Sequence, residues 1–355
     1  MKIYIETYGC AANQADSDEM ATLLRKKHEI VDSDERADLI ILNSCGVKGS
    51  TENKILARLD NLKGKKVIIA GCLPKIIKNK LKRMFPKFSL IGPDEIMDIE
   101  RIVNEVSKGK RVIELEEKSY CLVPFSEVKE AQPIVICKGC AGNCAYCASK
   151  LARGKIESFS VDCIKKIVES AVKKGAKKIL LTAQDTGAYG IDIGLDLPIL
   201  LSELVKLPGD FKIRVGMMNP NHALKFMDRL VEIYMHPKIM KFLHIPVQAG
   251  SDKVLKDMRR QYTVVDFEKI VETFRKKIPE ITISTDIICG FPTETEADFE
   301  KTIELVERVK LEVVNISKFY PRPGTEAKKM KLLSTEDIKA RSRKLSELYA
   351  KLRKA

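Results

Sequence analysis

The stretch CKGCAGNCAYC, residues 137–147, places four of the chain's ten cysteines within eleven positions. It continues from PIVIC (133–137), an apolar run that is typical of a buried strand. The cysteines therefore begin where a strand ends. Such a concentration of thiols indicates a metal or redox site, and the other six cysteines, scattered from Cys10 to Cys289, have to be explained beside it.

Three kinds of metal site compete for this run. A structural zinc site draws its thiolates from two pairs a dozen or more residues apart, whereas only three residues separate Cys140 from Cys144. The bacterial ferredoxin run C-x2-C-x2-C-x3-C-P also differs, because the spacing here is x2, x3, x2 and Ala148 follows. The subset Cys140, Cys144 and Cys147 supplies three thiolates to a four-iron cluster and leaves one iron open to a ligand. Cys137 is then the extra cysteine, expected to be a small buried residue.

The sequence after residue 132 alternates β-rich runs with amphipathic helical patterns. Six such β-rich runs occur, at 133–137, 178–185, 211–220, 242–248, 281–291 and 313–322. Because eight units close a barrel, six predict an open, partial (β/α)6 barrel with its site at the carboxyl ends of the strands. A basic helix is expected to follow from Ser334, with Asp337 in capping-box spacing.

The first third of the chain shows the same alternation. Its β-rich runs lie at 2–6, 38–43, 66–71, 88–92 and 111–115, with helical patterns at 14–27, 50–62 and 73–84. This order predicts a doubly wound parallel sheet, so the whole chain is expected to be an α/β protein. The predicted parts are an N-terminal domain (1–117), a linker (118–132), the partial barrel (133–330) and a C-terminal basic helix (331–355).

Three further cysteines each follow one of the first three predicted strands: Cys10 in KIYIETYGC, Cys45 in LIILNSC and Cys72 in VIIAGC. The carboxyl ends of parallel strands meet at one edge of a sheet, which is where doubly wound folds bind ligands. Gly9 and Gly71 stand beside two of these cysteines and are expected to leave room for a bulky cluster. The alternative is that buried cysteines commonly end strands. We favour a second cluster held by three thiolates, again with an open iron.

Composition narrows the class of protein. The chain has 63 Lys and Arg against 49 Asp and Glu, a net charge of +14, which favours a polyanionic partner such as nucleic acid; a generally Lys-rich surface is the alternative. No apolar stretch approaches the length of a membrane span, and MKIYIETYGC lacks the pattern of an export signal. We therefore expect a cytoplasmic protein with no membrane partner, and metal or redox cysteines rather than a disulfide framework.

The run CAGNCAYC after the strand PIVIC resembles the signature of the radical S-adenosylmethionine (SAM) enzymes. The resemblance implies that SAM binds the open iron through its methionine amino and carboxylate groups and yields a 5′-deoxyadenosyl radical. Residues at the barrel's active face are then predicted cofactor contacts: Tyr146, Gln184, Asp185, Arg214 and Gln248. For Gln184 and Asp185 an ordinary turn at the start of a loop is the alternative.

Motifs along almost the whole chain resemble the methylthiotransferase family. They are ETYGCAANQADSDE, LNSCGVKGSTE and AGCLPK in the N-terminal part, and CAGNCAYC, ARGKIES, HIPVQAGSDKVLKDMRRQYT, TDIICGFPTETEADF and FYPRPGTEA in the barrel. This resemblance implies an enzyme with two 4Fe-4S clusters, in which SAM serves as methyl donor and as radical source. A sulfide or polysulfide on the N-terminal cluster is methylated, and the radical takes a hydrogen from an unactivated carbon that then receives the methylthio group.

Lys150 and Arg153 follow the cysteine run, where the family's similar motif lies close to the radical site. They are candidate contacts to phosphate or substrate. A helix end with solvated basic residues is the alternative.

LTAQDTGAYG, VGMMNPNH and CGVKGSTE are most similar to the archaeal and eukaryotic branch of the family. That branch acts on N6-threonylcarbamoyladenosine next to the tRNA anticodon, so the resemblance implies tRNA as a partner, with a flavodoxin- or ferredoxin-like electron donor. Another tRNA adenosine, a ribosomal protein aspartate, a two-cluster radical enzyme of another reaction type and a non-catalytic iron–sulfur protein remain the alternatives. The family usually ends in a tRNA-binding TRAM domain, which we expect to be absent or truncated after LYAKLRKA. The bases at 339–354 are then expected to contribute to tRNA binding.

Overall fold

The structure is a computed structural model that describes residues 1–46, 49–119 and 122–353. The chain forms two compact units, each built from separate stretches of sequence. The first comprises Met1–Cys140, Ala148–Gln184 and Leu207–Phe211, and the second comprises Ala141–Cys147, Asp185–Lys206 and Lys212–Ala355. The domain boundaries expected from the sequence stay a prediction.

A six-stranded, all-parallel sheet forms the N-terminal part of the first unit, in the order β2-β1-β3-β4-β5-β6. Its strands are β1 (Lys2–Tyr8), β2 (Glu29–Val31), β3 (Leu39–Ser44), β4 (Val67–Gly71), β5 (Ser89–Ile91) and β6 (Ile113–Glu114). The five predicted strands are confirmed. β2, with three residues, has no counterpart among them, because so short a run carries no clear period.

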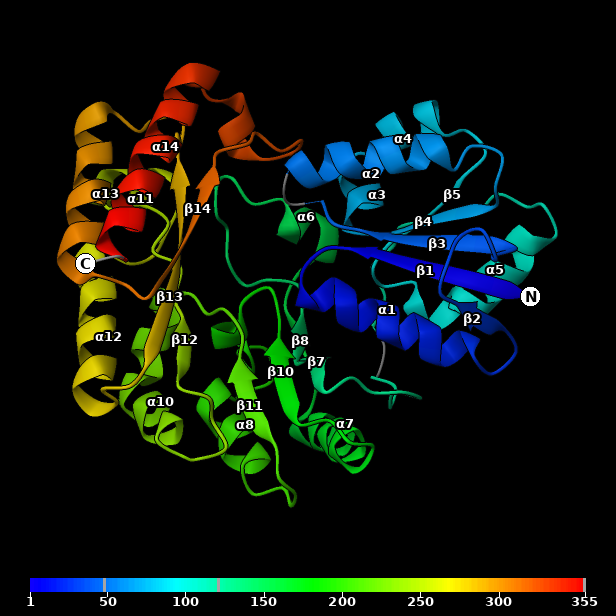
Figure 1. The fold of residues 1–355 in the computed structure, drawn as a ribbon, viewed down its shortest axis with the longest axis horizontal. Helices are drawn as coiled ribbons and strands as arrows, with labels where there is room; N and C mark the ends of the chain where they lie inside the picture. Colours follow the sequence, from blue (N-terminus) through cyan, green and yellow to red (C-terminus); the bar gives the residue numbers. More distant parts are fainter. Residues whose placement is uncertain (47–48, 120–121, 354–355) are drawn as a thin grey trace. The chain divides into compact units, whose positions relative to one another are not determined.

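Helices cover both faces of this sheet, as Figure 1 shows. On one face lie α1 (Ala11–Leu24), the short 3₁₀ helix η1 (Ile96–Asp98) and α5 (Ile99–Ser107); on the other lie α2 (Gly49–Asn61), α3 (Cys72–Ile76) and α4 (Lys78–Met84). β3 is buried throughout, with Leu39 and Ile41 packed in the first layer and Ile40 and Leu42 in the second. A strand covered on both faces has to be apolar at every position rather than at every other one.

The rest of the first unit contains the start of the cysteine run, up to Cys140, and the segments that follow the run. β7 (Ala131–Val135) pairs in parallel with β10 (Lys178–Thr182), while the two-residue strands β8 (Cys137–Lys138) and β9 (Glu157–Ser158) pair antiparallel. Along the chain, α6 (Ser149–Arg153) lies between β8 and β9, and α7 (Val161–Lys173) lies between β9 and β10. The Ser160 hydroxyl accepts a hydrogen bond from the Cys163 amide and so caps α7.

The second unit contains the other four predicted barrel strands, each followed by a helix. They are β11 (Lys212–Val215), β12 (Phe242–His244), β13 (Thr282–Cys289) and β14 (Val313–Lys318), of which the last three form a parallel sheet. Its helices are η2 (Thr186–Ala188), α8 (Leu197–Leu204), α9 (Pro220–Ala223), η3 (Leu224–Phe226), α10 (Met227–Tyr234), α11 (Asp252–Asp257), α12 (Val264–Lys277), α13 (Glu296–Val309), η4 (Glu326–Lys329) and α14 (Thr335–Leu352).

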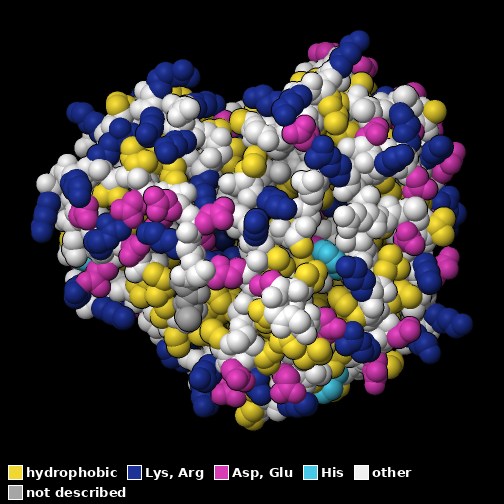
Figure 2. Space-filling model, turned by 180° about the vertical axis from the view of Figure 1, so that it is seen from behind, with side chains coloured by type: hydrophobic (Ala, Val, Ile, Leu, Met, Phe, Trp, Pro, Cys, Tyr) yellow, Lys and Arg dark blue, Asp and Glu magenta, His cyan; other side chains and the backbone are white. Residues whose placement is uncertain are grey.

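Helix α14 begins as expected, because the Ser334 hydroxyl accepts a hydrogen bond from the Asp337 amide. No described helix is both long and apolar enough to cross a membrane. Figure 2 shows Lys and Arg side chains spread over the visible face and interspersed with Asp and Glu. On that face the positive charge is therefore dispersed rather than gathered into a single patch.

Candidate functional site

Cys10, Cys45 and Cys72 occupy equivalent places at the carboxyl ends of three neighbouring strands. Cys10 precedes the first residue of α1, Cys45 follows β3 directly, and Cys72 is the first residue of α3. Because β1, β3 and β4 are adjacent and parallel, the three cysteines lie along one edge of the sheet. Cys45 and Cys72 are buried, whereas Cys10 is exposed.

The glycines beside these cysteines pack closely and do not leave the open space expected from the sequence. A Cβ atom on Gly9 would lie 2.5 Å from the Asn13 side-chain oxygen, and one on Gly71 would lie 2.4 Å from Asn43 Oδ1. Gly71 also has a φ of +89°, which other residues rarely adopt. The expectation of a roomy site was wrong in this respect: the glycines are needed so that the chain can turn against its neighbours.

Arg153 links this edge of the sheet to the segment after the cysteine run. Its Nε donates to Cys72 Sγ at 3.3 Å, while Nη1 and Nη2 donate to the Asp16 carboxylate at 3.3 and 2.5 Å. The guanidinium also interacts electrostatically with Cys10. Arg153 is buried, so the contact to substrate expected from the sequence stays a prediction, as it does for the partly buried Lys150.

Burial strongly affects the chemistry of Cys72. Desolvation raises the pKa of its thiol to about 11, although the positive charge of Arg153 acts in the opposite direction. Metal ligation requires the thiolate, so metal binding here would release a proton from Cys72. A sulfur that already accepts a hydrogen bond from a cation suits a cluster ligand, and the three thiols at this edge fit the predicted cluster.

The second set of cysteines lies in the loop between β8 and α6. Cys140 belongs to the first compact unit, and its amide donates to the Gly154 carbonyl at 3.3 Å. Cys144 and Cys147 belong to the second unit and share a tight turn, in which the Cys147 amide donates to the Cys144 carbonyl at 3.2 Å. Their joint ligation of one cluster stays a prediction. Cys137 is fully buried, as expected for the extra cysteine.

Arg260 is the counterpart of Arg153 in the second unit. Its Nη1 donates to Cys144 Sγ at 3.2 Å, and its Nη2 donates to the Asn219 side-chain oxygen. The side-chain nitrogen of Asn219, Nδ2, in turn donates to Asp185 Oδ2 at 2.8 Å, and His222 Nδ1 lies 2.8 Å from the same oxygen. A chain of hydrogen bonds thus joins a predicted cluster ligand to a buried carboxylate.

Asp185, one of the predicted cofactor contacts, already has several partners within the protein. Burial pushes its pKa up, but hydrogen bonds from His222 and Asn219 outweigh this and hold the pKa below its ordinary value. Its carboxylate also accepts from the Gly187 amide and so caps η2. The side chain is ionised and shapes the loop after β10; a direct contact with the cofactor stays a prediction.

Gln184 and Gln248, two other predicted cofactor contacts, each carry a buried amide oxygen that has no hydrogen-bond partner among the described residues. Leaving such an acceptor unsatisfied is costly, so it marks a place where a donor on a ligand would fit. Gln248 also has a φ of +72°, a strained conformation for a residue with a side chain. Both residues fit the donor groups of SAM.

Arg214 and Tyr146 complete the predicted cofactor contacts. The Arg214 guanidinium lies 4.2 Å from the centre of the Phe242 ring, a cation–π geometry. Tyr146 packs edge-on against Phe291 with ring centres 6.4 Å apart, and burial raises the pKa of its hydroxyl well above the ordinary value. These are contacts within the protein, so cofactor binding by Arg214 and Tyr146 stays a prediction.

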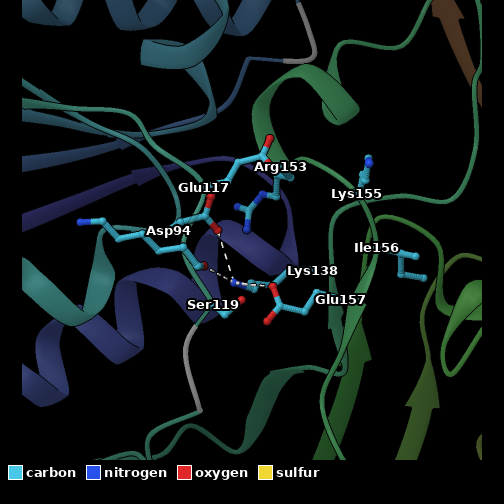
Figure 3. Close-up of a pocket in the computed structure, with 9 residues that line it drawn as sticks. Asp94, Glu117, Ser119, Lys138, Arg153, Lys155, Ile156 and Glu157 are labelled. Atoms are coloured by element: carbon cyan, nitrogen blue, oxygen red, sulfur yellow. Dashed lines mark hydrogen bonds and ion pairs between the residues drawn. The ribbon is translucent and has the colours of Figure 1, made fainter. Parts of the chain in front are cut away.

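A polar cavity of about 260 Å³ lies in the first unit, and Figure 3 shows Arg153 and Lys138 among its lining residues. Lys138 is buried, and its Nζ lies 3.5 Å from Asp94 Oδ1 and 3.3 Å from Glu157 Oε2. The cavity therefore reaches the residue that contacts Cys72, and charged groups of both signs line it. Such a lining suits a small polar ligand better than an apolar one.

Several residues of these sites carry no signal that the sequence pattern could reveal. Asp16 and Arg260 are ordinary charged residues in a chain with 49 acidic and 63 basic side chains, and Asn219 looks like a turn residue before Pro220. Only the approach of segments far apart in sequence gives them a role. The quoted motifs contain all three residues, since Asp16 lies in ETYGCAANQADSDE, Asn219 in VGMMNPNH and Arg260 in MRRQYT, but the motifs assign them no role.

Comparison with known families matches residues 134–306 to the radical SAM superfamily and residues 2–92 to uncharacterized protein family UPF0004. A Pyrococcus horikoshii protein named a probable threonylcarbamoyladenosine tRNA methylthiotransferase is 43% identical over 357 residues, covering 98% of this chain and 84% of the relative. A Xenopus laevis protein of the corresponding name is 38% identical over 362 residues, covering 98% of this chain and 65% of the relative.

Among solved structures, the radical S-adenosylmethionine methyltransferase TsrM from Kitasatospora setae aligns with a TM-score of 0.68 at 14% identity, covering 92% of this chain and 73% of that one. This likeness concerns the fold and confirms the predicted class, in which a parallel-sheet domain precedes a radical SAM domain. The sequence relatives go further, because their identity extends over nearly the full chain. The chain belongs to the threonylcarbamoyladenosine tRNA methylthiotransferase family of radical SAM enzymes.

Proposed function

We propose that this protein is a radical SAM methylthiotransferase that converts N6-threonylcarbamoyladenosine next to the tRNA anticodon into its 2-methylthio derivative. The names of its archaeal and eukaryotic relatives support this substrate. The observation that carries the proposal is the alignment of Cys10, Cys45 and Cys72 along one sheet edge. Radical formation needs one cluster only, so a second set of thiols favours a reaction that also handles sulfur.

When bound, two 4Fe-4S clusters and SAM supply the electron, the radical that abstracts hydrogen, the methyl group and a place for the sulfur. The chain's own residues hold and orient these groups. Cys10, Cys45 and Cys72 hold one cluster, and the thiols of residues 140, 144 and 147 hold the other. Gln184 and Gln248 orient SAM through their buried amide oxygens.

The partners follow from this chemistry. The tRNA is a polyanion, and the net charge of +14 supports its binding to this chain. A flavodoxin- or ferredoxin-like protein supplies electrons to the SAM-binding cluster. We place the protein in the cytoplasm, where reduced thiols and tRNA are both present.

Anaerobic counting of iron and sulfide on reconstituted protein tests the two sites. The parent protein should bind about eight irons, and about four should remain in a Cys10/Cys45/Cys72→Ala variant and in a Cys140/Cys144/Cys147→Ala variant. Cys137 stays in place in each variant. About four irons in the parent, all lost with the second set, would rule out the N-terminal cluster and the methylthiotransferase assignment with it.

The substrate is tested by incubating loaded protein with SAM, sulfide and reductant, and analysing the nucleosides of digested tRNA by mass spectrometry. One tRNA carries N6-threonylcarbamoyladenosine, and a matched transcript carries unmodified adenosine at the same position. We expect the mass increase of a methylthio group in the first tRNA only. Modification of the unmodified transcript alone, or transfer without sulfur, would contradict the proposed substrate or reaction.

A further inference from the structure

Arg153 occupies a position that its expected contact with substrate does not explain. It is the last residue of α6, yet its side chain lies buried between Asp16 in α1 and Cys72 in α3. These partners are 137 and 81 residues away in sequence. The side chains of Arg153 and Asp16 are only 4% and 3% exposed, so the pair is shielded from solvent.

A buried guanidinium is tolerated only where an anion compensates its charge. Both oxygens of the Asp16 carboxylate accept hydrogen bonds from Arg153: Oδ1 from Nη1 and Oδ2 from Nη2. This bidentate contact fixes the plane of the guanidinium. The remaining donor, Nε, is thereby directed at Cys72 Sγ, 3.3 Å away. Lysine has a single ammonium group and cannot make this arrangement.

We propose that Arg153, held in place by Asp16, is a positioning residue that sets the reduction potential of the N-terminal iron–sulfur cluster through its hydrogen bond to Cys72. The inference rests on the proposed function, since it requires a cluster at Cys10, Cys45 and Cys72. Reduction adds negative charge to a cluster and its thiolates. A hydrogen bond and a positive charge at one sulfur stabilise that reduced state and raise the potential.

The test uses the full chain with Cys140, Cys144 and Cys147 replaced by Ala, so that only the N-terminal cluster contributes a signal. Its midpoint potential is measured by redox titration followed by electron paramagnetic resonance, with iron content determined on the same samples. Arg153→Gln should lower the potential by about 59 mV or more, equivalent to a tenfold smaller one-electron equilibrium constant for reduction. Arg153→Lys keeps the charge without the directed donor and should give an intermediate value.

Lys155→Gln is the matched control, because Lys155 is an exposed base two residues further along the same segment. It removes the same charge without touching a cysteine, and the potential should stay at the parent value. If Arg153→Gln does not fold, as judged by circular dichroism, Arg153→Lys decides: a lowered potential with about four irons retained supports the proposal. A parent potential in every variant that retains its iron would overturn it. Absence of iron from the parent of this series would instead contradict the proposed function itself.

Discussion

In each predicted set of cluster cysteines, at least one sulfur accepts a hydrogen bond from an arginine. Arg153 donates to Cys72, and Arg260 donates to Cys144. A carboxylate holds each arginine in place. Asp16 binds Arg153 directly, whereas Asp185 acts on Arg260 through the side-chain amide of Asn219. Each arginine is therefore fixed by a second polar group, which directs its remaining donor at the sulfur.

The variant Gln248→Gly should weaken SAM binding without lowering the stability of the fold. Glycine adopts a φ of +72° without strain and removes a buried acceptor that has no partner among the described residues, so the free energy of unfolding should stay unchanged or rise. Loss of the amide should weaken SAM binding by about 1–3 kcal/mol, roughly 5- to 150-fold in Kd. Equilibrium binding of SAM to the reconstituted protein and urea unfolding of the metal-free protein measure the two effects.

Gln132→Ala provides the comparison for that variant. Gln132 is also buried, but its side-chain oxygen accepts from the Lys129 amide and its side-chain nitrogen donates to the Asp18 carboxylate. Its loss should reduce stability by about 1–3 kcal/mol and leave the affinity for SAM unchanged. Equal SAM affinity in Gln248→Gly and the parent would show that the amide oxygen of Gln248 does not meet the cofactor.

The positions of the predicted cluster cysteines are set by the ends of strands and the starts of helices. Cys10 and Cys72 lie at the first turns of α1 and α3, directly beyond β1 and β4, so the sheet sets their positions. Two helices of the second unit, α12 and α13, begin at regular caps. Thr263 and Thr295 each form a capping box with an aspartate three residues later.

Removing the cap of α12 should destabilise the protein without affecting its chemistry. Thr263 Oγ1 accepts from the Asp266 amide at 3.2 Å, and Asp266 Oδ2 accepts from the Thr263 amide at 2.9 Å. Thr263→Ala should lower the free energy of unfolding by about 1 kcal/mol, as measured by urea denaturation of the metal-free protein. Thr273→Ala in the same helix should be nearly neutral, because that hydroxyl only bonds back to the Lys269 carbonyl. Equal losses in both variants would mean that the cap contributes nothing of its own.

Helix α14 carries basic side chains of two kinds. Arg341 is buried and pairs with the buried Glu294, whereas Lys344 is exposed and forms a surface pair with Glu300. The other described bases of the predicted 339–354 stretch are exposed: Lys339, Arg343, Lys351 and Arg353. Lys354 lies outside the described residues. The expected contribution to RNA binding therefore belongs to the exposed bases rather than to Arg341.

Replacing those four exposed bases of α14 by Gln should weaken tRNA binding. Each phosphate contact that is lost should reduce the slope of log K against log salt by nearly one, because fewer counterions are released. Filter binding across a salt series measures the affinity and the slope. The control replaces four exposed bases of the first unit, Lys78, Arg83, Lys87 and Lys108, and so removes the same net charge. An equal loss in both variants would indicate general electrostatics rather than contact by α14.

Over the whole molecule, the sequence predicted what depends on local pattern. Strand ends placed Cys10, Cys45 and Cys72, and the alternation of strands and helices gave the fold class. Side-chain contacts between residues far apart in sequence could not be predicted, because no local pattern relates Arg153 to Asp16. The role of Gly71 was misread for the same reason: its neighbour Asn43 comes from another strand.

The buried charges of the first unit give the whole molecule a pH-dependent stability. Burial raises the pKa of Glu19 well above its ordinary value of 4.5, and the charge of Asp16 adds to the effect. The folded state therefore keeps this proton at pH values where the unfolded chain has lost it, so stability falls as pH rises above about 4.5 until the folded-state pKa is passed.

Glu19→Gln keeps the size of the side chain and removes its titration. Its free energy of unfolding should exceed that of the parent at pH 7, and the difference should shrink as the pH falls toward 4.5, where the unfolded chain also begins to protonate this carboxyl. Urea denaturation of the metal-free protein between pH 4.5 and 8 measures this, with the exposed Glu35→Gln as the comparison. A constant difference across the range would mean that Glu19 ionises normally in the folded protein. The buried bases Lys138 and Arg153, which lower its pKa, would then outweigh desolvation.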